Sequence, residues 1–329
     1  MPDLVDLVPL PRVWDRMERL ERRLFEVTVS EHNHLTDIAQ HLLAAGGKRY
    51  RPLLALLASE FGPSNDDRPI EAGVAVELIH VGSLYHDDVI DEADTRRGAI
   101  SANTNWSNTI AILAGDFLMA RASETAATHL SKESVRLLAA TYAELVEGQT
   151  RELALDFDLD HGLDAYERVI DQKTASLIRT SVRLGAMAAD ADADTIEAIS
   201  TWAGEVGIVF QIADDVLDLT ATSETLGKPA GSDIHEGKFT MPLLLALQGT
   251  DGERIRTLLD QPRPYPNEAV AEVIDLVRSG GYVDATVEAA LRRLDRADHA
   301  LGALPDIEAL PVLQSVGRYL VDRVTSRRG

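Results

Sequence analysis

The sequence contains no cysteine, which excludes disulfide bonds, thiolate chemistry and metal sites built on cysteine. Aromatic residues make up only 5% of the 329 residues, so a hydrophobic core must consist mainly of aliphatic side chains. No apolar run approaches the length of a membrane-spanning helix, and the first residues lack the basic and then apolar layout of a signal peptide. We therefore expect a cytoplasmic protein.

Positive charge is scarce. The chain has 54 acidic and 32 basic residues and a net charge of −22, which argues against a nucleic-acid partner. Lysine is rarer still, and of its few positions four lie in segments that contain glycine or threonine: Lys48, Lys173, Lys228 and Lys238. Because a compact ammonium group suits a phosphate oxygen where a planar guanidinium does not fit, this placement predicts an anion site.

The apolar residues, 45% of the chain, recur at three- and four-residue spacing, which is typical of amphipathic helices. No segment shows the alternation of a strand, and no linker divides the chain. The sequence therefore predicts an all-α fold with a single domain over residues 1–329. We expect helices over 11–30, 35–45, 53–61, 69 to about 91, 109–129, 132–155, 171–189 and 200–218, with further helices within 243–326.

The helix that begins near residue 69 ends in a cluster of carboxylates. Asp87 and Asp91 are one turn apart and lie on one face, with Asp88 about 100° around the helix. Mg²⁺ between the two carboxylates would remove their repulsion and leave open positions for a phosphate. Arg96 and Arg97 follow and suit bidentate contact with phosphate. The segment predicts a diphosphate site, although a solvated acidic helix end would look the same.

The acidic pattern occurs a second time. Another apolar helix ends with the same i, i+1 and i+4 spacing at Asp214, Asp215 and Asp218. Two Gly-Lys pairs follow, at Lys228 and Lys238, in a segment with glycine and proline that can form a loop over a charged ligand.

Two further segments combine cations with donors for an anion. Residues 46–52 place three cations beside two glycines, so backbone N–H groups and side chains can converge on one anion; a basic turn is the alternative. Lys173 and Thr174 pair an ammonium with a hydroxyl near the start of a helix, and here the alternative is an ordinary helix cap.

Taken in order, these motifs resemble the trans-isoprenyl diphosphate synthases, the polyprenyl synthetase family. The resemblance covers residues 46 to 242 and rests on GGKRYRP at 46–52, ELIH at 77–80, HDDVIDEADTRRG at 86–98, GD at 115–116, KT at 173–174, FQIADDVLD at 210–218 and the two Gly-Lys pairs at 227–238. It implies an all-α fold around a central cavity and a homodimer. It also implies Mg²⁺-dependent condensation of an allylic diphosphate with isopentenyl diphosphate.

The resemblance assigns roles residue by residue. Asp87 and Asp91 would hold Mg²⁺ on the allylic diphosphate with Asp88 supporting them, and Asp214 would hold a further Mg²⁺ from the opposite wall, with Asp215 and Asp218 beside it, giving about three ions per site. The allylic diphosphate would contact Arg96, Lys173, Lys228 and Lys238. Isopentenyl diphosphate would contact Lys48, Arg51, His80 and Arg97. Polar groups near the reacting carbons would be Thr174 and Gln211, and a further site residue would be Gln149.

Product length would depend on the positions four and five residues before the first aspartate. These are Ser83 and Gly82, small residues that would leave a tunnel open, so we expect a product longer than C15. The tunnel floor could instead lie at Ile79, Leu78 or residues 117–119. The sequence of residues 76–98 is most similar to that of bacterial medium- and long-chain polyprenyl diphosphate synthases.

Other functions share some of these features. A geranylgeranyl (C20) diphosphate synthase would use the same chemistry with a shorter product. A terpene cyclase would not need Lys48, Arg51 and His80, and a non-catalytic regulatory subunit would not need two intact acidic motifs. A transient contact with a membrane could accompany release of a long product.

Overall fold

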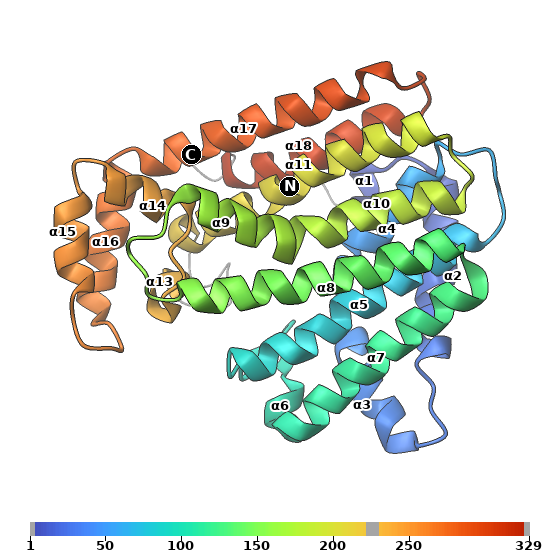
Figure 1. Ribbon diagram of the computed structural model, residues 1–329, viewed down its shortest axis with the longest axis horizontal. Coiled ribbons are helices and arrows are strands. Elements are labelled where there is room, and N and C mark those ends of the chain that lie inside the picture. Colours follow the sequence, from blue (N-terminus) through green and yellow to red (C-terminus); the bar gives the residue numbers. More distant parts are fainter. Residues whose placement is uncertain (1–3, 222–229, 326–329) are drawn as a thin grey trace.

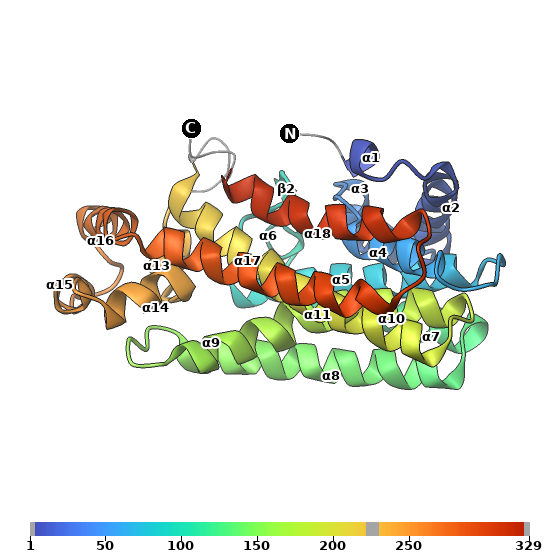
Figure 2. The ribbon, with the colours of Figure 1, turned by 90° about the horizontal axis from the view of Figure 1, so that it is seen from above.

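The structure is a computed structural model that describes residues 4–221 and 230–325, and these residues are mostly helical, as the sequence predicts. Helices follow one another with short connections, and Figures 1 and 2 show them stacked in layers. The first half of the chain forms α1 (Leu4–Leu7), α2 (Pro11–Val27), α3 (Asn33–Ala44), α4 (Tyr50–Ser59), α5 (Arg68–Ile90), α6 (Ala102–Asn105), α7 (Asn108–His129) and α8 (Lys132–Leu155).

The second half continues the same pattern. It contains one irregular element, η1, which is a π-helical turn, and one short 3₁₀ turn, η2. Its elements are α9 (Leu163–Ile170), η1 (Asp171–Ala175), α10 (Ser176–Ala188), α11 (Ala193–Thr220), α13 (Ser232–Glu236), α14 (Met241–Gln248), α15 (Gly252–Leu259), α16 (Asn267–Ser279), α17 (Tyr282–Ala300), η2 (Leu301–Ala303) and α18 (Ala309–Thr325).

A small antiparallel hairpin corrects the expectation that the chain has no strands. Two-residue strands β1 (Thr95–Arg96) and β2 (Ala99–Ile100) pair with each other. The turn between them has positive φ at both positions, 56° at Arg97 and 77° at Gly98, the conformation of tight hairpin turns. Strands this short carry no readable alternation, so sequence periodicity could not predict them.

Helix α5 lies at the centre of the fold. It packs against α2, α4, α7 and α10, and most extensively against α7. Its start has Pro69 in the first turn, where a missing N–H costs nothing, and its residues are apolar around the whole circumference, as in a buried helix. The helix ends at Ile90, although the N–H of Asp91 still bonds the carbonyl of Asp87 at 2.8 Å. The predicted one-turn spacing of the two carboxylates is therefore present.

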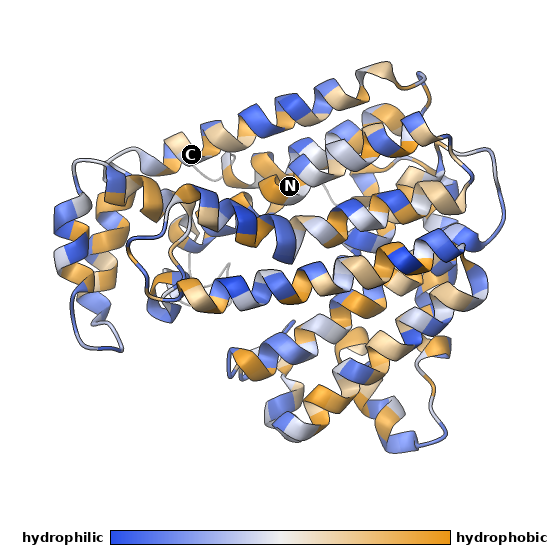
Figure 3. Ribbon diagram, viewed as in Figure 1, coloured by the Kyte–Doolittle hydropathy of each residue, from blue (hydrophilic) through white to orange (hydrophobic). Residues whose placement is uncertain are grey.

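The core consists mostly of leucine, isoleucine, valine and alanine, as the scarcity of aromatics predicts. Nearly all buried apolar residues of the described ranges belong to one connected cluster, which runs from Val8 to Val324 in α18. Figure 3 shows hydrophilic residues along the outward faces of the helices. Within the described ranges, none of the helices is long and apolar enough to cross a membrane.

Candidate active site

The main cavity, about 720 Å³ in volume, lies between α5, α7, α8, α10 and α11. Most of its wall is apolar. Ten residues predicted from the sequence line it: Arg51, His80, Ser83, Asp87, Arg96, Gln149, Lys173, Thr174, Gln211 and Asp214. The fold thus brings residues from five separate motifs, over 160 positions apart in the chain at the extremes, to one space.

The three carboxylates of the first acidic motif point in different directions. Asp87 faces the main cavity, where burial raises its pKa, Lys173 opposes that shift and Asp91 adds to it. Asp88 is fully buried and lies 2.6 Å from Nε of Arg96, which holds this arginine at the cavity wall. Asp91 contacts Nζ of Lys238 at 3.2 Å, so the first motif meets the Gly-Lys segment.

The second acidic motif, on α11, likewise splits into three environments. Asp214 lines the main cavity, as Asp87 does. Asp215 is buried, accepts a hydrogen bond at 2.9 Å from Nε2 of Gln211, and accepts another from Tyr166. Asp218 is buried against the start of α13, where its carboxylate accepts from the backbone N–H of Asp233 at 3.3 Å. Of the three carboxylates, Asp214 is therefore the one that shares the main cavity with the first motif.

A second cavity of about 320 Å³ adjoins the main one and collects the residues predicted to bind isopentenyl diphosphate. Lys48, Arg51, His80 and Arg97 all line it, and Arg51 and His80 line the main cavity as well. Within the described residues, the buried Nε of Arg51 has no hydrogen-bond partner. Burial lowers the pKa of this arginine, and a bound phosphate would restore the preference for its charged form.

A buried carboxylate, Glu77, holds this basic subsite together. Only 1% of Glu77 is exposed, and its Oε1 lies 3.1 Å from Nη1 of Arg49 and 3.7 Å from Nη2 of Arg97. Arg97 also donates to the carbonyls of Leu42 and Gly46, at 2.9 and 2.5 Å, which anchors the strained hairpin turn. Arg97 is thus fixed by the protein itself.

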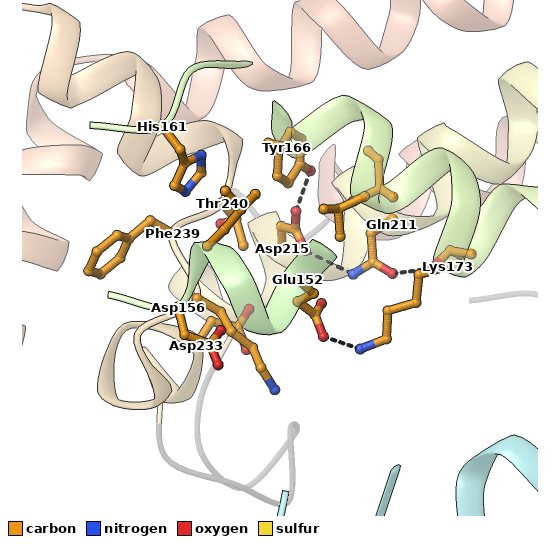
Figure 4. A pocket seen from close by; sticks show the side chains of 15 residues that line it. Glu152, Asp156, His161, Tyr166, Lys173, Gln211, Asp215, Asp233, Phe239 and Thr240 are labelled. Atoms are coloured by element: carbon orange, nitrogen blue, oxygen red, sulfur yellow. Dashed lines mark hydrogen bonds and ion pairs between the residues drawn. The ribbon is translucent and has the colours of Figure 1, made fainter. Parts of the chain in front are cut away.

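The predicted cations Lys173 and Lys238 are paired with carboxylates that the sequence analysis did not select. Lys173 forms an ion pair with Glu152 of α8, and Figure 4 shows this pair at the edge of a third cavity of about 200 Å³. Lys238 lies 2.8 Å from Glu236 in addition to its contact with Asp91. A diphosphate that binds here would exchange these carboxylate partners for phosphate oxygens. Lys228 lies outside the residues that the structure describes.

The π-helical turn η1 carries Lys173 and Thr174 into the main cavity. Such turns concentrate at functional sites because the extra residue in the turn changes the direction of the side chains. Oγ1 of Thr174 donates to Oε1 of Gln211 at 2.9 Å, which joins η1 to α11. The sequence predicted these two residues near the same reacting atoms, and here they are in direct contact.

The two residues predicted to control product length occupy different places. Ser83 lines the main cavity. Gly82 lies at the crossing of α5 and α7, where an added Cβ would be 2.9 Å from Cε of Met119 and 3.1 Å from the carbonyl of Gly115. A side chain at position 82 would therefore first press on α7. His86 lines the main cavity, and its Nε2 lies 3.2 Å from the carbonyl oxygen of Ile112.

The donor set fits Mg²⁺ bound together with a substrate. Among the described residues, no three potential ligand side chains are grouped closely enough to hold a metal ion alone. Mg²⁺ is usually bound through one or two carboxylates plus substrate phosphates rather than in a cage of protein ligands. Asp87, pushed toward its neutral form by burial and by Asp91, is a group that a divalent cation would favour in its charged form.

Three contributors to the site, Glu77, Glu152 and Tyr166, received no role from the sequence. Glu77 stands inside the ELIH segment, so its position was visible, but its contacts depend on how α4 and the hairpin fold back onto α5. Glu152 lies one turn after Gln149 and accepts a hydrogen bond from its amide at 3.2 Å. This helical spacing could have indicated that Glu152 faces the same site as Gln149. For Tyr166 no pattern in the sequence points to α11.

Comparisons with known proteins agree with this geometry. Residues 32–277 match the polyprenyl synthetase family. The nonaprenyl diphosphate synthase of Mycobacterium tuberculosis is 39% identical over 98% of this chain and 96% of its own. The heptaprenyl diphosphate synthase of Staphylococcus aureus superposes with a TM-score of 0.89 at 31% identity, over 95% and 99% of the two chains.

A third relative was crystallised with a metal and a ligand. The geranylgeranyl pyrophosphate synthase of Corynebacterium glutamicum, complexed with calcium and isoprenyl diphosphate, has a TM-score of 0.84 and 39% identity, over 95% of this chain and 96% of that one. The similarity to all three proteins extends over nearly the whole chain and is not confined to the acidic motifs.

Proposed function

Since the chain belongs to the polyprenyl synthetase family and is a prenyltransferase of that family, we propose that it condenses an allylic diphosphate with isopentenyl diphosphate to a trans-polyprenyl diphosphate longer than C15. The single observation that carries this proposal is the junction of two cavities. A basic subsite with Arg51 and His80 adjoins a largely apolar cavity that is lined by Asp87 of α5 and Asp214 of α11. Two anionic substrates can therefore lie with their carbon chains in one space.

The acidic residues bind the metal ions, and the basic residues bind the two diphosphates. Mg²⁺, when bound at Asp87, Asp91 and Asp214, supplies positive charge that stabilises the departing diphosphate. Lys173 and Lys238 move from their carboxylate partners to the same diphosphate. Lys48 and Arg51 hold the second diphosphate and orient its double bond toward the allylic carbon. The new carbon–carbon bond forms as the allylic carbon–oxygen bond breaks, and a proton passes to the released diphosphate.

The apolar wall of the main cavity gives the growing chain a place away from water. Small Ser83 leaves this wall open beneath Asp87, which favours a long product. A C20 product is the alternative, and the Corynebacterium relative carries that name. About three Mg²⁺ ions per site fit two facing acidic motifs that both meet substrate phosphates.

We also propose a homodimer whose interface includes α7 and α8. Four apolar residues on these helices are between 43% and 54% exposed: Ile112, Leu113, Val146 and Leu153. Apolar surface gathered on adjacent helices is typical of an interface. Ile112, Val146 and Leu153 also line the main cavity, so a second copy would close its open side. The cytoplasmic location, the single domain over 1–329, a transient membrane contact and the lack of a nucleic-acid partner remain predictions.

Incubation of the purified protein with Mg²⁺, isopentenyl diphosphate and separate C10, C15 and C20 allylic diphosphates tests the proposal, with products resolved by chromatography. We expect elongation beyond C20, and loss of all elongation in the double variant D87N/D214N. The variant D260N is the control, because Asp260 is exposed, lies outside all of the motifs and lines none of the three cavities. A folded wild-type protein that elongates none of the primers would contradict the proposed function.

A further inference from the structure

A row of hydrogen-bonded side chains runs from α9 through α11 to η1, and Figure 4 shows most of it at the third cavity. The hydroxyl of Tyr166 donates to Oδ2 of Asp215. Nε2 of Gln211 donates to Oδ1 of the same carboxyl group at 2.9 Å, and Thr174 donates to Oε1 of Gln211 at 2.9 Å. Three elements thus contribute to one row that ends at the main cavity.

Tyr166 lies at the remote end of this row. It is 5% exposed and lines the third cavity, whereas Gln211 and Thr174 line both the third cavity and the main one. Tyr166 is not among the described residues that line the main cavity. The connection of Tyr166 to atoms bound in the main cavity therefore runs through Asp215 and Gln211.

The row has one direction in the structure. The NH₂ group of Gln211 faces Asp215 and its oxygen faces Thr174, so Asp215 accepts hydrogen bonds from both Tyr166 and Gln211. Thr174 has a single hydroxyl hydrogen and gives it to that oxygen. The lone pairs of Thr174 Oγ1 are then left for the main cavity, and its hydrogen is turned away from the cavity.

We propose that Tyr166 is a positioning residue for the condensation, because its hydroxyl fixes Asp215, which fixes the amide of Gln211 and through it the hydroxyl of Thr174. This inference rests on the proposed function, since it takes the allylic carbon to pass beside Thr174. An oxygen lone pair that faces this carbon stabilises its developing positive charge, whereas a hydroxyl hydrogen turned inward would oppose it. The row thus sets the polarity of the cavity wall before substrate binds.

The first test is Tyr166→Phe, which keeps the ring and removes the hydroxyl. Without that donor Asp215 is free to turn and the amide of Gln211 loses its fixed orientation. We expect kcat to fall roughly tenfold, the effect of losing one buried hydrogen bond in the transition state, while KM for both substrates stays within about twofold. The matched control is Tyr282→Phe, because the hydroxyl of Tyr282 also donates to a carboxylate, Oδ2 of Asp251 at 3.0 Å, and neither residue lines the three cavities, so its kcat should not change.

The second test separates positioning from a general loss of structure. Thr174→Val removes the end of the row, and Tyr166→Phe in that background should lower kcat no further, because Tyr166 then has nothing to position. Should Tyr166→Phe not fold, Gln211→Glu interrupts the same row in the middle and should give the same loss of kcat at unchanged KM.

The outcomes distinguish the two proposals. Two results would overturn the role of Tyr166 and leave the proposed function intact. One is a loss of kcat in the double variant equal to the product of the losses in Thr174→Val and Tyr166→Phe. The other is a kcat of Tyr166→Phe within twofold of the active wild type. A wild type that elongates no primer would overturn both, and a kcat loss in Tyr282→Phe equal to that in Tyr166→Phe would reduce the effect to lost stability.

Discussion

At the scale of single residues, the basic subsite shows how nearby positive charges set the protonation state of a histidine. His80 lies among Arg51, Arg97 and Arg49, and burial together with these positive charges lowers its pKa well below the ordinary 6.5. The imidazole is therefore neutral at neutral pH and can offer both a donor and an acceptor to a ligand. The carboxylate of Glu77 forms ion pairs with Arg49 and Arg97, and it forms none with His80.

The first prediction concerns the pH dependence of stability. Below about pH 6.5 the unfolded chain binds a proton at His80 that the folded protein does not, so this residue lowers the free energy of unfolding by up to about 1.4 kcal/mol per pH unit until the folded-state pKa is reached. We expect His80→Gln to lose less stability than the wild type between pH 6.5 and 5, in urea unfolding followed by circular dichroism. Parallel curves for the two proteins would contradict the lowered pKa.

The second prediction concerns product length. Ser83 lines the main cavity, so Ser83→Phe should block the space beneath Asp87 and shorten the product to about C15 or C20, with the rate of the first condensation kept. Chromatography of the products gives the answer. Gly82→Ala serves for comparison, because its added methyl group would press on α7 and should change stability more than product length. An unchanged product from Ser83→Phe would place the floor elsewhere.

At the scale of elements, the position of η1 depends on a close crossing with α8. An added Cβ at Gly148 would lie 2.7 Å from the backbone N of Lys173 and 2.9 Å from Cβ of Gln172. Real Cβ atoms do not approach backbone that closely, so only glycine allows α8 this near to the turn that carries Lys173 and Thr174. The crossing explains a glycine in the middle of a helix, where it is otherwise unfavourable.

The third prediction follows from this crossing. Gly148→Ala should push η1 away from α8, lower the free energy of unfolding by about 1–3 kcal/mol and reduce kcat, because Lys173 and Thr174 move together. Gly162→Ala is the matched control, since open space surrounds its Cβ position, and its stability should stay within about 0.5 kcal/mol of the wild type. Thermal unfolding and initial rates measure both. A stable and fully active Gly148→Ala would show that η1 tolerates displacement.

At the scale of the whole molecule, a net charge of −22 coexists with a site for two anions. The fold resolves this by placing Lys48, Arg51, Arg96 and Lys173 on the walls of connected cavities, while acidic residues spread over exposed faces. The local cations and any bound metal then set the field that a diphosphate experiences, not the total charge.

The fourth prediction tests the proposed homodimer. Leu113 is 54% exposed on α7 and does not line the main cavity, so Leu113→Asp should disrupt the interface without altering the substrate site directly. Light scattering should show the mass falling to that of one chain, 35.8 kDa. Leu291→Asp on α17 is the matched control, because Leu291 is 45% exposed on a different helix. A mass that Leu113→Asp and Leu291→Asp leave equally unchanged would place the interface elsewhere.

Helix periodicity and the spacing of acidic residues were readable in the sequence because both are local. The one-turn separation of Asp87 and Asp91 follows from helix geometry alone, and so does the repeat at Asp214. The hairpin that presents Arg96 could not be predicted, since its strands are two residues long and its turn is held by contacts of Arg97 with Leu42 in α3 and with Gly46 just after α3.

By itself the sequence determined the all-α class, the two acidic motifs and the cations and polar groups that accompany them, because residue type and helical spacing suffice for these. Only the tertiary structure decided which carboxylates meet. Asp87 and Asp214 face one cavity, whereas Asp88, Asp215 and Asp218 are turned to Arg96, Tyr166 and α13. Neighbours in the chain point in different directions around a helix, and their partners come from elements brought close by packing of the core.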